Sequence, residues 1–340
     1  MASKGKPSPV TAIGIDLGAS AVRVCLPGKS PDIDEPSLFA LSKRREILAH
    51  GDAAEALLLR APESAEEYRP LLGKERLTKG EDGKIDVSGR VEALKLLIGA
   101  FSPELCAAAE EYSAAAVICT EDGASAKEIG ILTAEAEKYG IPAVRTVRRS
   151  DANAAAVMHE ARTRRGKAPS DFILVDIGLE NTNVSLICGG KVRTSGQIPV
   201  GGIDFDERIA EQLEEKHGMA ADVERIDRLK RELSGSDSAE LLCYGAENAI
   251  PDTVTVTGGE LAGIFGNEIE RICSGLVSLL RHLPKEQASG VLRGGIILVG
   301  GGSLLPGLAE KIESTTGIGT TVPECAAFAA ASGAALAVNG

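Results

Sequence analysis

Two stretches of the chain share one pattern of apolar and polar positions. In residues 12–24 and again in residues 172–187, an apolar run is followed by Asp, an apolar residue and Gly, and the apolar run then resumes. β-Branched residues favour strands and the glycine favours a turn, so each stretch predicts a β-hairpin. Asp16 and Gly18 lie at the first tip, and Asp176 and Gly178 lie at the second.

Such a tip has a chemical use. The backbone N–H groups of a tight turn can bind a phosphate, and the carboxylate beside them can hold a metal ion or its water. Two tips that face each other would form a two-sided phosphate site. For either copy alone an ordinary β-turn is an equally good interpretation, and the repetition favours the phosphate site.

The rest of the pattern alternates helices and strands, which indicates an α/β protein. Residues 33–84 are expected to be irregular, with helical pieces around 53–59, and to form a small insert. The expected helices are 87–101, 124–139, 151–161, 201–217, 223–233, 258–283, 308–316 and 326–338. The other expected strands are 114–119, one beginning at 140, 253–256 and 295–299, the last followed by glycines 300–302.

Composition and charge exclude several classes of protein. The 340 residues are long enough for two domains, and the net charge of −12 argues against nucleic acid or an anionic membrane as the main partner. The seven cysteines form no C-x-x-C pair and the four histidines are far apart, so we predict neither a disulfide framework nor a metal cluster. No apolar run reaches the roughly 20 residues that span a bilayer. We expect a cytoplasmic protein without membrane insertion.

Four motifs stand in a recognisable order. They are Gly-Ile-Asp-Leu-Gly at 14–18, Leu-Val-Asp-Ile-Gly at 174–178, Gly-Gly-Ile-Asp-Phe-Asp-Glu at 201–207, and Gly-Gly-Gly-Ser-Leu-Leu-Pro-Gly-Leu at 300–308. In this order the chain resembles the actin-like ATPase superfamily, which includes sugar kinases and heat-shock chaperone ATPases. Within it, the chain is most similar to the filament-forming bacterial actins, the MreB- and MamK-like family.

The resemblance implies a duplicated, ribonuclease H-like fold with two lobes and a nucleotide cleft between them. Residues 1–9 would be a disordered lead. The first lobe would be 10–150, with its insert at about 33–84 and its completion by the closing segment 321–340. The second lobe would be 151–320, with an insert at about 205–257.

The resemblance also implies ATP and magnesium as cofactors and gives roles to particular residues. Asp16 and Asp176 would hold magnesium or its water, and Asp151 and Asp176 would be catalytic. Asp151 lies where the family has a glutamate that polarises the attacking water. Nucleotide contacts would come from Gly18, Ala19, Ser20, Gly178, Asn181, Thr182, Gly202, Asp227, Lys230, Gly300, Gly301 and Gly302. Asp227 and Lys230 would clasp adenosine, and a surface ion pair is the alternative for them.

Some positions depart from the family pattern. A phosphate-approaching glycine is replaced by Glu180, Asn181 replaces a threonine, and the closing aspartate is Asn183. In the first hairpin Ala19 replaces the usual threonine, which removes a hydroxyl. Glu180 would repel a γ-phosphate unless its side chain points away. We therefore expect nucleotide binding with at most slow ATP hydrolysis.

The implied function is a cytoskeletal filament in the cytoplasm that positions or scaffolds cellular structures. Its subunits would stack head-to-tail, with cargo or adaptor proteins as further partners and no direct contact with nucleic acid. The polar N-terminal segment favours a filament without a membrane anchor. The alternatives are a non-filamentous nucleotide switch, a chaperone-like ATPase or a pseudo-ATPase scaffold. A small-molecule kinase is disfavoured because no acceptor site is evident.

Overall fold

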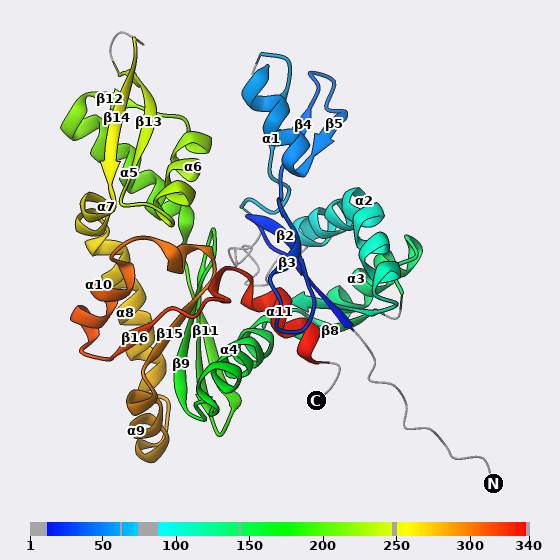
Figure 1. Cartoon of the computed structure of the whole chain (residues 1–340), viewed down its shortest axis with the longest axis vertical. Helices are drawn as coiled ribbons and strands as arrows, with labels where there is room; N and C mark the ends of the chain where they lie inside the picture. The colour runs from blue at the N-terminus through cyan, green and yellow to red at the C-terminus, as the bar shows by residue number, and fades with distance from the viewer. Residues whose placement is uncertain (1–11, 62, 74–87, 143, 247–249, 338–340) are drawn as a thin grey trace. The chain divides into compact units, whose positions relative to one another are not determined.

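The structure is a computed structural model, and it describes residues 12–61, 63–73, 88–142, 144–246 and 250–337. The chain divides into two compact units (Figure 1). The first comprises the residues up to Ala168 together with those from Phe328 onward, and the second is Pro169–Ala327. Each unit is built on its own five-stranded sheet and carries a smaller three-stranded sheet.

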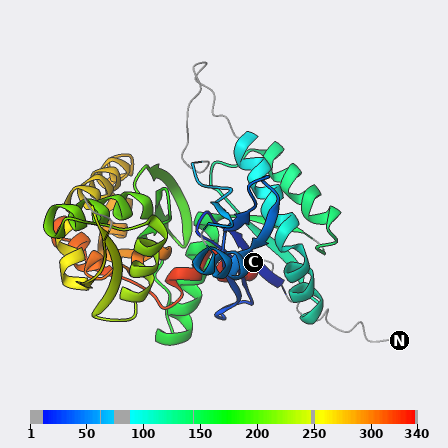
Figure 2. The same cartoon turned by 90° about the horizontal axis from the view of Figure 1, so that it is seen from above.

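The first unit has strand order β3-β2-β1-β7-β8. β1, β2 and β3 form an antiparallel meander, and β7 and β8 continue the sheet in parallel with β1. The strands are β1 (Ala12–Leu17), β2 (Ala21–Cys25), β3 (Pro31–Pro36), β7 (Ala115–Thr120) and β8 (Arg145–Arg148). The helices are α2 (Ser88–Glu111), α3 (Ala126–Lys138), α4 (Arg149–Arg165) and α11 (Ala329–Leu336). Figure 2 shows α2 and α3, in cyan and teal, side by side in this unit.

The second unit repeats this topology with strand order β11-β10-β9-β15-β16. Again three antiparallel strands are followed by two parallel ones. The strands are β9 (Phe172–Ile177), β10 (Thr182–Cys188), β11 (Lys191–Ile198), β15 (Ile296–Val299) and β16 (Thr320–Thr321). The helices are α5 (Gly202–His217), α8 (Gly266–Leu280), α9 (Lys285–Gly294), α10 (Leu308–Thr316) and the short 3-10 turn η1 (Gly301–Leu304). A second short 3-10 turn, η2 (Ala326–Phe328), crosses the boundary back to the first unit. The two matching sheets bear out the duplicated α/β architecture.

The insert in the first unit differs from the irregular stretch that the sequence suggested. It forms a sheet of order β5-β4-β6 with one helix, which Figure 1 shows in lighter blue. Its elements are β4 (Phe39–Leu41), β5 (Ile47–His50), α1 (Gly51–Arg60) and β6 (Glu66–Tyr68). Strands of three or four residues are too short to give a readable alternation of polar and apolar positions.

The insert in the second unit has the sheet order β12-β13-β14. Its elements are β12 (Met219–Ala220), α6 (Val223–Leu233), β13 (Ser238–Gly245), β14 (Pro251–Thr257) and α7 (Gly258–Ile264). The expected bounds of α6 and α10 agree with the structure, whereas the long helix expected at 258–283 is two helices that meet at Phe265. The ring of Phe265 packs edge-on against Phe205 of α5 at 4.8 Å, inside the apolar core of this unit.

The boundary between the units falls after α4, not before it as expected from the sequence. α4 packs on α11, and both lie in the first unit. A Cβ on Gly333 would lie 1.7 Å from the carbonyl oxygen of Ala152, and one on Gly14 would lie 1.9 Å from that of Ala331. Backbone therefore touches backbone on both sides of α11, and this contact ties α4 to the first sheet.

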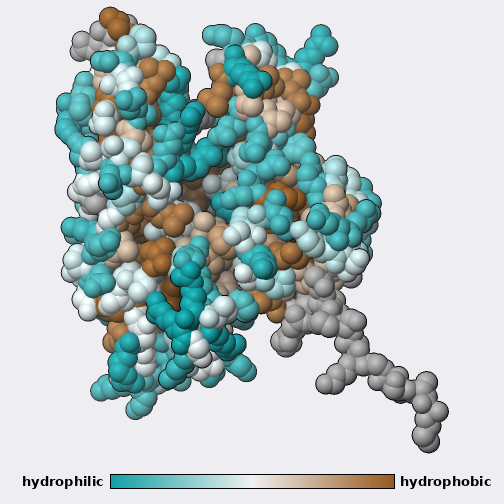
Figure 3. All heavy atoms as spheres, in the orientation of Figure 1, coloured by the Kyte–Doolittle hydropathy of each residue, from teal (hydrophilic) through white to brown (hydrophobic). Residues whose placement is uncertain are grey.

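The surface mixes polar and apolar side chains (Figure 3). In the first insert the side chains of Ile47, Leu48 and Leu59 are each about half exposed. Among the residues that the structure describes, no helix combines the length and the apolar character needed to cross a membrane.

Candidate functional site

The two Asp-x-Gly turns have the same backbone. The N–H of Gly18 donates to the carbonyl oxygen of Ala21 at 3.1 Å, and that of Gly178 donates to the carbonyl oxygen of Asn181 at 2.9 Å. A Cβ on either glycine would lie 3.2 Å from that same carbonyl oxygen, which is close enough to disfavour a side chain. The shared motif therefore produces the same local structure in both units, as the sequence pattern predicted.

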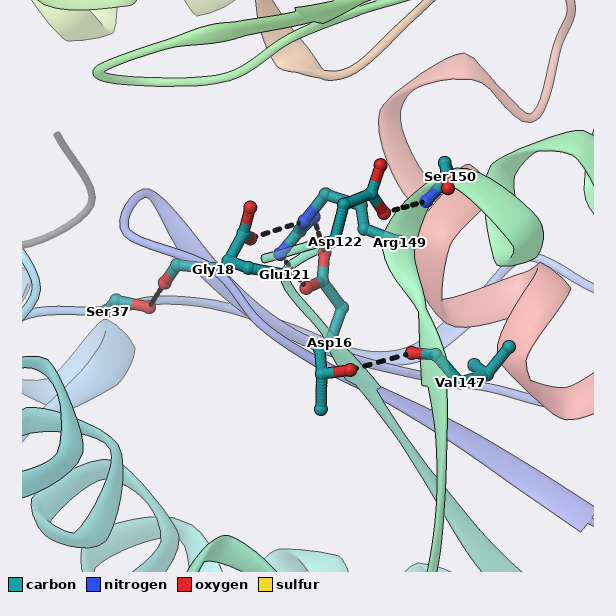
Figure 4. Close-up of polar contacts among 9 residues, drawn as sticks. Asp16, Gly18, Ser37, Glu121, Asp122, Val147, Arg149 and Ser150 are labelled. Carbon is teal, nitrogen blue, oxygen red and sulfur yellow. Dashed lines mark hydrogen bonds and ion pairs between the residues drawn. The ribbon is translucent and has the colours of Figure 1, made fainter. Parts of the chain in front are cut away.

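The first turn is also held from outside its hairpin. The hydroxyl of Ser37, which follows β3, donates to the carbonyl oxygen of Gly18 at 2.6 Å (Figure 4), and the Ser37 N–H donates to the carbonyl oxygen of Ser20 at 3.0 Å. At the tip, Ala19 is buried and Ser20 is exposed. The turn is thus fixed in place, with the Ser20 side chain open to solvent.

Asp16 lies at the end of β1 and is paired with an arginine. Nη2 of Arg149 lies 2.8 Å from Oδ1 of Asp16, and Nη1 lies 3.2 Å from Oδ2 (Figure 4). Nε of the same guanidinium donates to Oε1 of Glu121 at 2.8 Å. Sequence reasoning missed Arg149 and Glu121. The only available signal was the Arg-Arg pair at 148–149, directly before the predicted helix that carries Asp151.

The loop after β7 positions this arginine. Oδ1 of Asp122 accepts the backbone N–H of Ser150 at 3.0 Å, in the first turn of α4. The hydroxyl of Thr120 donates to the carbonyl oxygen of Val147 at 3.2 Å. A carboxylate at a helix N-terminus satisfies an N–H group that has no partner within the helix. These contacts fix the junction between β8 and α4, and hence the place from which Arg149 extends.

Asp151, the predicted water-positioning residue, lies in the first turn of α4. Its side chain is 38% exposed and pairs with Arg148, whose Nη2 lies 2.7 Å from Oδ2. It is therefore accessible, and it forms an ion pair with the last residue of β8, which directly precedes its helix.

The second turn is more tightly enclosed. Asp176, the last residue but one of β9, is buried, Asn181 is buried, and Glu180 is 1% exposed. The Thr182 hydroxyl donates to the carbonyl oxygen of Val200 at 2.7 Å, so this predicted nucleotide contact already has a partner within the protein.

The start of α5 closes on the second turn. The N–H of Gly202 donates to the carbonyl oxygen of Gly178, and that of Ile203 donates to the carbonyl oxygen of Leu179, both at 2.9 Å. A Cβ on Gly201 would lie 2.5 Å from the Leu179 carbonyl oxygen. The Gly-Gly pair in this motif thus allows backbone to pack on backbone, and the Gly202 N–H is used inside the unit.

The three consecutive glycines have different surroundings. A Cβ on Gly300, whose φ is +82°, would lie 2.4 Å from Oδ1 of Asp176. One on Gly302 would lie 2.4 Å from Cγ2 of Ile177, whereas one on Gly301 would meet no heavy atom within 4 Å. Packing therefore accounts for the two outer glycines. The middle one leaves open space beside the backbone, which suits the close approach of a ligand.

Lys230 is a buried cation. Its Nζ lies 2.6 Å from Oδ1 of Asp206 and 3.8 Å from Oδ1 of Asp227, and it donates to the carbonyl oxygen of Gly202 at 3.2 Å. The Lys230 and Asp206 side chains are both at least nine-tenths buried. Lys230 and Asp227 thus lie on one face of α6, as their spacing predicted, and Lys230 pairs mainly with Asp206 of α5.

A magnesium ion at Asp16 does not fit these contacts. Both carboxylate oxygens of Asp16 accept from a guanidinium, which places a positive charge directly beside the carboxylate that was expected to hold the ion or its water. In the described part of the chain, no group of three or more His, Cys, Asp or Glu side chains is arranged to hold a metal ion.

Comparisons with known proteins identify the family of this chain. The MreB/Mbl protein family model matches residues 10–340. The chain is 26% identical to the cell shape-determining protein Mbl of Bacillus cereus, with 93% of each chain covered. It is 25% identical to the cell shape-determining protein MreB of Escherichia coli, covering 92% of this chain and 88% of that protein.

A solved structure shares the fold. The crystal structure of MreB 5 of Spiroplasma citri bound to AMPPNP superposes with a TM-score of 0.74 at 20% sequence identity, covering 97% of this chain and 96% of that one. The same protein bound to ADP superposes equally well. The fold is therefore actin-like, and the chain belongs to the MreB/Mbl family of actin-like cytoskeletal proteins.

Proposed function

We propose that this chain binds ATP at its two Asp-x-Gly turns and assembles head-to-tail into a cytoskeletal filament. The observation that carries the proposal is the repeated turn, with the same Gly N–H contact at the end of the corresponding strand in each unit. Membership of the MreB/Mbl family supports it, as do the nucleotides in the two Spiroplasma citri structures. Filament growth follows from heterologous contacts, which repeat without closing.

The nucleotide would be bound mainly by backbone. The turn at Gly18 to Ser20 and the open backbone at Gly301 are suited to phosphate, because neither requires a side chain to move aside. Asp227, at the edge of the buried Lys230 pair, is the proposed contact for the adenosine.

Hydrolysis, if it occurs, would be slow. Asp151 is the proposed water-positioning carboxylate because it lies in the first turn of α4 and stays accessible. Asp176 is the proposed second catalytic carboxylate and the remaining candidate for contact with magnesium. Water would attack the γ-phosphate in line, with catalysis by positioning and charge.

The filament would act in the cytoplasm with cargo or adaptor proteins. The curated relatives in Bacillus cereus and Escherichia coli are described as cell shape-determining proteins. A scaffolding role at cellular structures is therefore the proposed use of the filament.

Electron microscopy and pelleting with ATP, with ADP and without nucleotide test the proposal, read beside nucleotide binding and phosphate release. We expect filaments with ATP and slow release of phosphate. Gly301→Val should weaken nucleotide binding, because its side chain would fill the open space beside the backbone. Gly259→Val in α7 is the matched control, since a Cβ there also meets no atom within 4 Å.

The outcomes separate the alternatives. Nucleotide binding without filaments at any concentration would favour a non-filamentous switch or a pseudo-ATPase. Asp151→Ala should abolish phosphate release and leave filaments intact, and unchanged release would refute the role of Asp151. Absence of nucleotide binding would refute the proposal as a whole.

A further inference from the structure

The positive charge next to the first Asp-x-Gly turn comes from a side chain of the protein itself. Arg149 meets Asp16 through both of its terminal nitrogens, with one N–H from each to a separate carboxylate oxygen (Figure 4). This paired geometry is the strongest form of ion pair between arginine and a carboxylate. Its single positive charge is shared between Asp16 and Glu121, and it offsets part of the carboxylate charge that would attract a divalent ion to Asp16.

The arginine is held in this position from several directions. Its Nε donates to Glu121, which follows β7, and its side chain is 15% exposed. The neighbouring Ser150 N–H is bound by Asp122 of the same loop. A side chain that is bound along its whole guanidinium edge and largely buried has lost most of its rotamer freedom before any ligand arrives. Arg149 is thus preorganised next to the turn and is not a freely moving surface residue.

The turn itself lacks a group that helps magnesium in other phosphate sites. In P-loop proteins a Ser or Thr hydroxyl of the phosphate loop holds the ion. Here Ala19, in the turn directly after Gly18, is buried and carries no oxygen in its side chain. The guanidinium and the missing hydroxyl are independent features, and both disfavour magnesium at this turn.

We propose that Arg149 takes the place of the divalent cation beside Asp16, so that this chain binds nucleoside triphosphate without requiring magnesium. The inference rests on the proposed nucleotide binding and concerns the charge compensation at that same site. A fixed guanidinium compensates phosphate charge in a way that chelators do not remove.

Binding of a fluorescent ATP analogue to the full-length chain, in EDTA and in magnesium chloride, tests the inference. For the unchanged protein we expect dissociation constants that differ by less than about threefold between the two conditions. Arg149→Met should weaken binding in EDTA by about tenfold, and magnesium should restore most of the loss. Arg149→Lys keeps the charge and should remain independent of magnesium, which guards against misfolding of the methionine variant.

Arg69→Met is the matched control, because Arg69 is 12% exposed and pairs with Glu67 in the first insert. It should leave the response to magnesium unchanged. Electron paramagnetic resonance of Mn²⁺ in the presence of nucleotide gives a second readout, and Arg149→Met should bind more Mn²⁺ than the unchanged protein does. Binding that requires magnesium in the unchanged protein would refute this inference alone. Absence of nucleotide binding in both conditions would refute the proposed function, and this inference with it.

Discussion

In the first unit, β7, the parallel neighbour of β1, is followed by two acidic residues, Glu121 and Asp122. In the second unit, β15, the parallel neighbour of β9, is followed by three glycines, 300–302. The two turns that these loops adjoin have the same backbone. The acidic loop fixes an arginine and a helix start, whereas the glycine loop brings bare backbone to the aspartate. The repeated motif thus determines the turn, and the neighbouring loop determines the chemistry around it.

The first unit, which has the acidic loop, also contains a buried ion pair. Breaking this pair should have the largest effect on the free energy of unfolding. The loop after β7 leads into α3, where Glu128 pairs with Arg90 of α2 at 2.5 Å and both side chains are buried. Glu128→Gln leaves the guanidinium without its counter-charge and should lower the free energy of unfolding by about 3–5 kcal/mol. Urea denaturation followed by circular dichroism measures the change. Glu92→Gln, in an exposed pair with Lys95, should change it by less than about 1 kcal/mol.

Lowering the pH should reduce the difference in unfolding free energy between the unchanged protein and Glu128→Gln. Burial raises the pKa of Glu128, but hydrogen bonds from the Ser125 N–H and Arg90 outweigh it, and the pKa lies below the ordinary 4.5. A lowered pKa stabilises the folded state above about pH 4.5, and this contribution is lost as the pH falls through the folded value. A difference that stays constant down to acid pH would contradict the pairing.

The role of the glycine loop in the second unit can be tested by substituting two of its three glycines separately. Gly300→Ala must place a Cβ near Asp176 Oδ1 at a positive φ, and should cost about 2–4 kcal/mol of unfolding free energy. Gly301→Ala should stay within about 0.5 kcal/mol, because nothing lies near its Cβ. Thermal and urea unfolding of the two variants measure this contrast. Equal losses of unfolding free energy would mean that packing restricts both glycine positions alike, against this expectation.

The smallest expected effects concern the hydroxyl contacts beside the turns. Ser37→Ala removes the hydrogen bond to Gly18, and Thr182→Val removes the one to Val200. Each should cost about 1 kcal/mol. The cost should be greater for Thr182, because that contact is fully buried and leaves a carbonyl without its partner. Urea titrations of both variants and of the double variant test whether the two sites act independently, as sites in separate units should.

Local features were readable from the sequence. The Asp-x-Gly turns, α6 and α10 follow from strand pattern, glycine position and helical periodicity within short windows. The pair between Arg149 and Asp16 was not readable, because it joins residues 133 positions apart and no local pattern predicts such a partner. The strands of the first insert were too short for the pattern of polar and apolar residues to predict them. The unit boundary was misplaced because the contact of Gly333 with Ala152 is purely tertiary.

The packing of α11 has a consequence for how the protein is made. A ribosome synthesises β1 and α4 early, but the helix that lies against both is translated only after the whole of the second unit. During translation, therefore, the second unit can complete its core while apolar surface on the first unit is still exposed to solvent. The first unit therefore cannot complete its core until α11 has been translated, and until then its sheet exposes apolar surface of the kind that makes partly folded chains prone to aggregation.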